Sequence, residues 1–277
     1  MKIILSRKGF DAGYGGFPSP ILPDGTLLSL PIPSYEKCRY SQLMACEGHT
    51  YADIMRMLSP TIRDSGTKIK MTDRISCHLD PDTRQSAKRR AQGWRAAFGQ
   101  ASAAQTHLRN QGVGGGDVFL FFGWFRQTEF YKDKLRFVAA EPGVHIIFAY
   151  LQIDRVIDGY KKTAPAWLHE HPHITNTFDS GSNNAIYIAK KHLSWDKARK
   201  GYGVFTYTED LVLTKPGLSR SRWDLPALFK KTNISYHDQS SWKNGYFQSA
   251  AKGQEFVARG TAPVVAWTKR LFCSQRK

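Results

Sequence analysis

The segment from His78 to Asp82, His-Leu-Asp-Pro-Asp, has the residue types and spacing best suited to chemistry. On an extended chain, residues i and i+2 point to the same side, so His78 and Asp80 would project together. Such a pair supplies two ligands of a two-histidine-one-carboxylate iron site. Asp80 and Asp82 have the same spacing and could instead bind a divalent metal beside a nucleotide-sugar diphosphate. A purely structural interpretation also stands, because either aspartate could cap a helix that begins near Gln85.

A second histidine-rich segment, His169-Glu-His-Pro-His173, places three imidazoles within five residues. A zinc deaminase would need H-x-E followed by P-C-x-x-C, and the second half is missing, so that class is excluded. A loop that contacts phosphate or responds to pH remains, as does an exposed cluster without a role. We therefore assign no metal and no cofactor from the sequence.

Other signatures of catalysis are missing from the sequence. It contains no G-x-G-x-x-G, no G-x-x-x-x-G-K-[ST] and no G-x-S-x-G motif. The glycine run from Gly112 to Gly116 reads as a turn before a strand. A nuclease ranks last, because no D-x(n)-E-x-K element is present.

The charge balance favours a polyanionic partner. The 277 residues include 40 Lys and Arg against 23 Asp and Glu, a formal charge of +17. Such an excess attracts polyanions. A solvated surface and an anionic membrane are the alternatives, but no basic amphipathic helix or acylation signal points to lipid. We expect DNA as the partner, with an extruded or single-stranded base, and no membrane.

Basic residues are interleaved with aromatic residues, a pattern suited to holding phosphates while rings stack on bases. This occurs around Trp94, Trp195 and Trp223. The candidate nucleic-acid-binding residues are Arg7, Lys8, Arg84, Lys88, Arg95, Asn110, Gln111, Trp124, Arg220 and Trp223. The candidate catalytic residues are Asp11, His78, Asp80 and Asp82, with Asp11 or Asp80 as base or metal ligand.

The patterns predict an α+β fold with a mixed or antiparallel sheet and helices mainly in the N-terminal half. A PUA-like barrel in the C-terminal half is one arrangement by analogy. We expect one domain over 1–277, with a sub-boundary near 112–116. Helices are predicted over 51–58 and 85–108, the second with Arg84, Lys88 and Arg95 on one face. Strands are predicted at 2–6, 117–125, 144–153, 184–189, 255–257 and 264–267, with a hairpin of 203–207 and 211–214.

The four cysteines are scattered, which predicts reduced thiols and no structural zinc. The apolar runs are too short to span a bilayer, and the start lacks a signal-peptide core. A cytoplasmic protein is expected.

Several strings resemble the nucleotide modification associated domain 3 family. They are Ile4 to Asp11, Gly15 to Gly25, Ser29 to Pro33, His78 to Asp82, Asn110 to Val113, Gly116 to Phe125, Phe247 to Ala250 and Gly253 to Val257. The resemblance covers essentially the whole chain. It implies a setting in DNA base hypermodification in bacteria and phages, alongside other base-modification enzymes.

The resemblance carries over no catalytic residues. The polar candidates within the matching strings rest on their chemistry alone, and they are Arg7, Lys8, Asp11, Ser19, Asp24, His78, Asp80, Asp82, Asn110 and Gln111. A base-modifying transferase or oxygenase is the leading hypothesis. The alternative is a PUA-like module that reads a modified base without altering it. Target base, donor and oligomeric state are left open.

Overall fold

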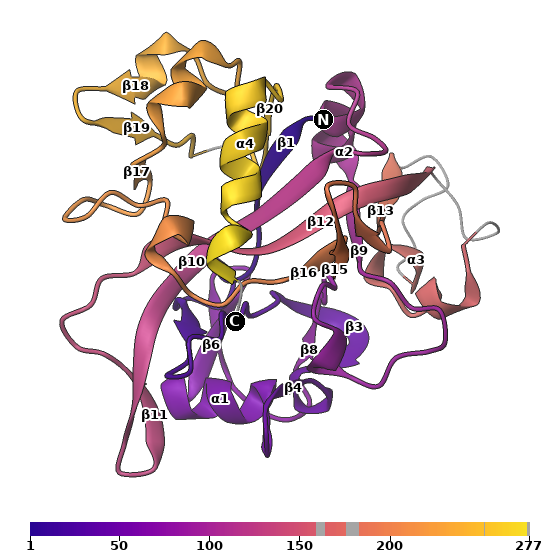
Figure 1. The fold of residues 1–277 in the computed structure, drawn as a ribbon. Coiled ribbons are helices and arrows are strands. Elements are labelled where there is room, and N and C mark those ends of the chain that lie inside the picture. Colours follow the sequence, from indigo (N-terminus) through magenta and orange to yellow (C-terminus); the bar gives the residue numbers. More distant parts are fainter. Residues whose placement is uncertain (159–163, 176–182, 252, 276–277) are drawn as a thin grey trace.

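A mixed sheet of nine strands forms the centre of the computed structural model, which describes residues 1–158, 164–175, 183–251 and 253–275 (Figure 1). The strand order is β20-β1-β10-β12-β13-β9, while β2 and β11 pair with β10 and β16 pairs with β12. Only β1 and β2 run parallel to β10; the other pairs are antiparallel. The strands are β1 (Ile3–Arg7), β2 (Ser19–Ile21), β9 (Ala97–Ala101), β10 (Val118–Tyr131), β11 (Lys134–Phe137), β12 (Val144–Asp158), β13 (Asn184–Ala189), β16 (Tyr202–Val204) and β20 (Glu255–Ala258).

The predicted α+β class and mixed sheet are confirmed. Among the described strands, the pairing ends at β20 and β9, so no closed barrel is seen there and the PUA-like barrel is not confirmed. Strands from both sides of residues 112–116 enter the sheet. The residues of that run form the turn before β10, where Asp117 accepts the N–H of Gly114 at 3.0 Å.

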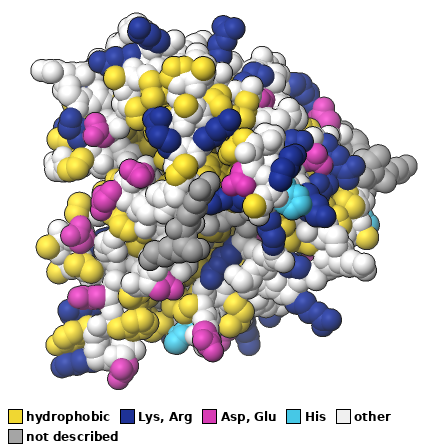
Figure 2. Space-filling model, in the orientation of Figure 1, with side chains coloured by type: hydrophobic (Ala, Val, Ile, Leu, Met, Phe, Trp, Pro, Cys, Tyr) yellow, Lys and Arg dark blue, Asp and Glu magenta, His cyan; other side chains and the backbone are white. Residues whose placement is uncertain are grey.

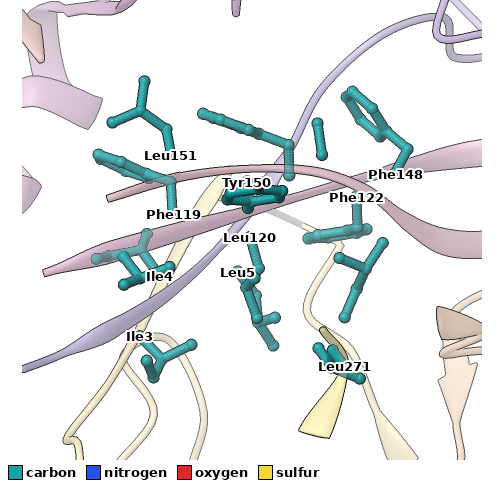
Figure 3. Packing of buried hydrophobic residues seen from close by; sticks show 14 of the residues in the cluster. Ile3, Ile4, Leu5, Phe119, Leu120, Phe122, Phe148, Tyr150, Leu151 and Leu271 are labelled. Atoms are coloured by element: carbon teal, nitrogen blue, oxygen red, sulfur yellow. The ribbon is translucent and has the colours of Figure 1, made fainter. Parts of the chain in front are cut away.

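The core explains why these segments are strands. The first part of β10 and most of β12 are buried on both faces, which matches their continuous apolar sequence. Figure 3 shows side chains of β1, β10 and β12 packed together, with Leu271, the residue that follows α4 (Ala262–Arg270), beside them. This rigid sheet fixes the positions of the residues at its edges.

The helices are α1 (Tyr51–Leu58), α2 (Ser102–Asn110), α3 (Pro172–Thr175) and α4 (Ala262–Arg270). The helix predicted over 51–58 is confirmed; Thr50 caps it through a hydrogen bond with the N–H of Asp53. The strand predicted at 264–267 is wrong, because this run lies in α4, where Val264, Trp267 and Thr268 are buried at helical spacing. Helices are therefore not concentrated in the N-terminal half. No described helix is long and apolar enough to cross a membrane.

The helix predicted over 85–108 is wrong over 85–101 and is confirmed only from Ser102, where α2 begins. Gln85–Ala87 forms a short 3-10 helix, a loop follows, and β9 then pairs with β13 before α2 begins. The apolar spacing is typical of a helix, but Phe98 and Gly99 lie in a strand because they pair with β13 of the sheet. Arg84, Lys88 and Arg95 consequently share no helix face.

The predicted hairpin of 203–207 and 211–214 is wrong as well, because both segments pair with β12. The smaller strands form separate two- and three-stranded sheets. They are β3 (Pro33–Arg39) with β8 (Ser76–Cys77), β4 (Met44–Cys46) with β5 (His49–Thr50), β6 (Thr61–Asp64) with β7 (Thr67–Lys70), β14 (His192–Leu193) with β15 (Asp196–Lys200), and β17 (Arg222–Trp223) with β19 (Tyr246–Gln248) and β18 (Trp242–Lys243). The other 3-10 helices among the described residues are Tyr40–Gln42, Ala166–Leu168, Glu209–Leu211, Ala227–Lys231, Gln239–Ser241 and Cys273–Gln275.

Candidate active site

A cavity of about 710 Å³, which we call the central cavity, brings together half of the residues selected from the sequence. It lies where β1, β9, β10 and β12 meet the loops after β8 and before β17, together with α3. Seven of the selected residues line it: Arg7, Lys8, Asp11, His78, Asp80, Trp124 and Arg220. Ligand cavities in proteins are of this size, roughly 300 to 1,000 Å³.

A cluster of histidine and aspartate side chains forms part of the wall. His78 Nε2 lies 3.8 Å from Asp80 Oδ2, and His173 Nε2 lies 3.5 Å from the same oxygen. The two imidazole rings meet edge to face, with centroids 5.3 Å apart. His78 and Asp80 come from the loop after β8, and His173 comes from α3, so the fold unites the two histidine-bearing motifs.

Each histidine of this cluster is oriented through its other ring nitrogen. His78 Nδ1 lies 2.6 Å from a carboxylate oxygen of Glu36, and His173 Nδ1 lies 2.7 Å from the amide oxygen of Asn184. Both partners accept, so each Nδ1 carries the proton and each Nε2 faces Asp80. The Asn184 amide also donates to the backbone oxygen of His173 at 2.9 Å, which fixes the orientation of the amide.

The carboxylate of Asp80 is 4% exposed and held from its other side. Its Oδ1 accepts the N–H of Gly99 at 2.9 Å, and His171 Nε2 lies 3.4 Å away. Position 99 requires glycine, because a Cβ there would lie 2.2 Å from the His173 ring. The strand β9 therefore supplies both a hydrogen bond to Asp80 and the space for His173.

The pKa values of the titratable groups in this cluster are strongly shifted. Burial lowers the pKa of His78, but hydrogen bonds to Asp80 and Glu36 outweigh it and raise the pKa to about 9. Burial lowers the pKa of His173 to about 4, against the attraction of Asp80. Burial would raise the pKa of Asp80, yet the neighbouring histidines hold it well below its usual range. Asp80 is thus an anion, and perturbed groups in a cavity are typical of functional sites.

Two arginines face the central cavity beside an indole ring. The Arg220 guanidinium lies 4.2 Å from the centroid of the Trp124 ring, and Trp124 is half-buried. Burial lowers the pKa of Arg7, and the Arg220 charge lowers it further, although Asp11 and Glu255 oppose this. Among the described residues, no carboxylate lies within ion-pair distance of Arg7 or Arg220. Two mutually repelling cations in one cavity create a site for an anion.

Lys8 differs from Arg7 because a buried acid neutralises it. Lys8 Nζ lies 2.7 Å from Glu255 Oε1, which also accepts a hydrogen bond from Gln100 at 2.7 Å. The side chain of Glu255 is 1% exposed. The predicted phosphate contact of Lys8 would therefore compete with a buried ion pair.

His145 is a further polar group on the cavity wall, and it was not predicted. It is 6% exposed, and its Nδ1 accepts a hydrogen bond from the indole N–H of Trp223 at 3.1 Å. Burial lowers its pKa to about 3, and Arg220 and Arg7 lower it in the same direction. His145 is therefore neutral with its proton on Nε2. Trp223 itself is fully buried, so its ring has no exposed face on which a base could stack.

The remaining predicted residues lie outside the central cavity. Asp82 forms a two-bond ion pair with Arg90, and Arg84 donates to backbone oxygens of Met44 and Ala45. Asp82 and Asp80 therefore do not act as a pair, and neither caps a helix at Gln85. Lys88 pairs with Glu170, Arg95 with Asp154, and Asn110 and Gln111 are exposed at the end of α2. Asp82 and Lys88 line a second cavity of about 350 Å³, on the side of the cluster where His171 lies.

Lysine and arginine side chains do not form a single patch on the face in Figure 2, where they are spread with acidic side chains among them. The tryptophans, by contrast, are not all sealed inside: Trp94, Trp124, Trp167, Trp195 and Trp242 are half-buried. The arginines of the central cavity, rather than a broad surface field (Figure 2), are therefore the feature that would attract an anionic ligand.

The fold and the cavity define an α+β protein with a charged, ligand-sized cavity lined in part by strands of a mixed sheet. The model of the nucleotide modification associated domain 3 family matches residues 2–259, and the chain belongs to this family. No curated protein and no solved structure matches the chain.

Proposed function

We propose that this protein takes part in the modification of DNA bases, in the cytoplasm of bacteria or of phage-infected cells, and that the central cavity holds the nucleotide. One observation carries the proposal. The same cavity combines two arginines that have no carboxylate partner among the described residues, an indole ring and a buried histidine-aspartate cluster.

The arginines supply the contact with phosphate. Guanidinium groups bind phosphate oxygens through paired hydrogen bonds, and the charge of Arg220 is close enough to contribute to the lowered pKa of Arg7. A phosphate between them would remove this repulsion. Arg7 is held in place by hydrogen bonds from Nη2 to the backbone oxygens of Ala251 and Gly253.

Trp124 and His145 supply contacts for a base. The indole of Trp124 lies on the cavity wall with Arg220 against its ring, an arrangement in which a base can stack beside a cation. The Nε2–H of His145 is a donor of fixed orientation in the same cavity. A base inside a duplex cannot reach such a cavity, so the substrate would be an extruded or single-stranded nucleotide.

The buried cluster supplies the reactive groups. Asp80 is an anion with two histidine nitrogens facing it, a set suited to holding a metal. Asp11 has a different place, because its Oδ1 accepts the N–H groups of Gly13 and Tyr14 in the loop at the cavity wall. Asp11 therefore shapes this loop, and Asp80 is the better candidate for chemistry. A transferase or an oxygenase would fit this arrangement.

The family resemblance points to the same cavity. Several of the strings that carry it contribute to the lining, namely those containing Arg7, His78, Trp124, Ser249 and Gln254. These strings are far apart in the sequence, and the fold brings them around one space.

Mass spectrometry of nucleosides tests the proposal. DNA would be isolated from cells that carry the wild-type protein with its neighbouring genes, and from cells with Asp80→Asn, Arg220→Gln or Arg136→Gln. Arg136 is an exposed cation on β11 that is paired with Glu129 and does not line the cavity, so its variant is the matched control. We expect a nucleoside of new mass with the wild type and the control, and its loss with the two cavity variants.

The same experiment separates modification from reading. If all nucleosides are unchanged while oligonucleotides still bind at the cavity, the protein reads a base rather than modifying it. A new nucleoside that persists in both cavity variants would place the chemistry elsewhere.

A further inference from the structure

Three ligand atoms converge on one point of the central cavity. His78 Nε2, Asp80 Oδ2 and His173 Nε2 all lie within 4.8 Å of one another. Bonds of about 2.0 to 2.2 Å to a metal place neighbouring ligand atoms about 3 to 3.5 Å apart. The distances of 3.8 and 3.5 Å to Asp80 are close to this range, so small rotations of the side chains would complete the site.

The surroundings of these residues are those of a metal site. Each ligand histidine donates its Nδ1–H to an oxygen, of Glu36 in one case and Asn184 in the other. Outer hydrogen bonds of this kind fix the tautomer so that the lone pair of Nε2 is presented to a metal. Once a metal displaces the proton between His78 and Asp80, three electron-pair donors face a common point, one of them anionic.

His171 provides a separate indication that the buried carboxylate is built to hold charge. Its Nδ1 accepts the N–H of His173 at 3.3 Å, so the proton is on Nε2. That Nε2 lies 3.4 Å from Asp80 Oδ1, and it is buried without a hydrogen-bond partner among the described residues. His171 supports Asp80 from the side opposite the cavity and leaves Oδ2 for a ligand.

We propose that His78, Asp80 and His173 bind one divalent first-row transition metal ion, with iron(II) the ion that this ligand set fits best. Two imidazoles and one carboxylate on one side of an ion leave the remaining coordination positions open. Those positions face the central cavity, because all three ligands line it together with Trp124 and Arg220. The ion would therefore be next to the nucleotide of the proposed function, although its binding does not depend on that function.

Titration of the purified full-length protein with cobalt(II) tests the proposal. Cobalt(II) reports its ligands through visible absorption, and calorimetry with zinc(II) and anaerobic iron(II) would give stoichiometry and affinity. We expect one equivalent per chain. His173→Gln and Asp80→Asn should each weaken binding by more than about 100-fold, since loss of a ligand exceeds the roughly 10- to 100-fold cost of losing an outer partner, which Asn184→Ala should show.

His169→Gln is the matched control, because His169 belongs to the same histidine-rich segment but is exposed and absent from the cavity. It should leave the affinity unchanged. Thermal unfolding would confirm that every variant is folded. Absence of stoichiometric binding to folded wild type, or binding that survives both His173→Gln and Asp80→Asn, would overturn the proposal and leave the cluster as a protonated ion pair.

Oligonucleotide binding measured on the same samples keeps the two proposals apart. If the protein binds metal but Arg220→Gln leaves oligonucleotide affinity unchanged, only the proposed nucleotide site is refuted. Oligonucleotide binding without any metal site refutes the metal alone.

Discussion

Trp223 donates its indole N–H to Nδ1 of His145 at 3.1 Å, and this contact joins the core of the sheet to the wall of the central cavity. The two residues belong to β17 and β12, and both side chains are buried. A fully buried tryptophan that seemed suited to stacking on a base instead fixes the tautomer of a neighbouring histidine.

The low pKa of His145 predicts that the stability of the fold depends on pH. Its pKa is about 3 in the fold against 6.5 in the unfolded chain, so its contribution is complete above pH 6.5 and is lost as the pH falls toward 3. The loss is about 1.4 kcal/mol per pH unit in that window. Between pH 6.5 and 4.5, urea unfolding should show wild type losing about 2 to 3 kcal/mol more than His145→Gln. Equal losses in the two proteins would contradict this account of His145.

The close approach of the His173 ring to Gly99 offers a steric test of the histidine-aspartate cluster. A Cβ at this position would lie 2.2 Å from the ring of His173, so Gly99→Ala must displace that ring. We expect a loss of about 1 to 3 kcal/mol in unfolding free energy and a weaker cobalt(II) complex. Gly114→Ala is the control, because nothing lies within 4 Å of a Cβ there. If the folded Gly99→Ala variant bound metal with unchanged affinity, the position of the His173 ring would not determine metal binding.

The buried ion pair between Glu255 and Lys8 predicts a large loss of stability when Glu255 is neutralised. Glu255→Gln leaves the Lys8 ammonium, whose side chain is 10% exposed, without its anion. Thermal or urea unfolding should show a destabilisation of about 3 to 5 kcal/mol. The exposed pair of Arg136 and Glu129 provides the comparison, and Glu129→Gln should cost less than about 1 kcal/mol. Similar costs for the two variants would mean that burial does not strengthen the Lys8 pair.

Arg220 predicts the salt dependence of nucleic-acid binding. If it contacts a phosphate, Arg220→Gln should reduce the slope of log affinity against log salt by roughly one unit, measured by fluorescence anisotropy with a single-stranded oligonucleotide. Arg95→Gln provides the comparison, because Arg95 is paired with Asp154 outside the cavity, and its slope should stay near that of wild type. The reverse order of effects would move the phosphate contact out of the cavity.

The sequence predicted the central strands and the first helix because their apolar patterns agree with their burial, as at residues 184–189, which form β13. The helix prediction was wrong over 85–101, where the spacing of Trp94, Phe98 and Ala101 is helical although β9 is a strand. Pairing with β13 decides that segment, and pairing between distant strands leaves no local signal.

The candidate site was predicted in halves. His78 and Asp80 were identified from their spacing, whereas His171 and His173 were treated as a separate cluster. Only the fold shows that α3 lies beside the loop after β8. Glu36, Asn184 and His145 carried no motif, since their roles depend on hydrogen bonds to residues 42, 11 and 78 positions away.

Photocrosslinking tests most directly that the central cavity binds a base. A single-stranded oligonucleotide carrying 5-iodouracil would be irradiated in complex with the protein, and the adduct located by tandem mass spectrometry. We predict an adduct on Trp124, reduced in Arg220→Gln and retained in Arg136→Gln. Adducts confined to residues outside the cavity, such as Trp242 or Trp195, would contradict the account.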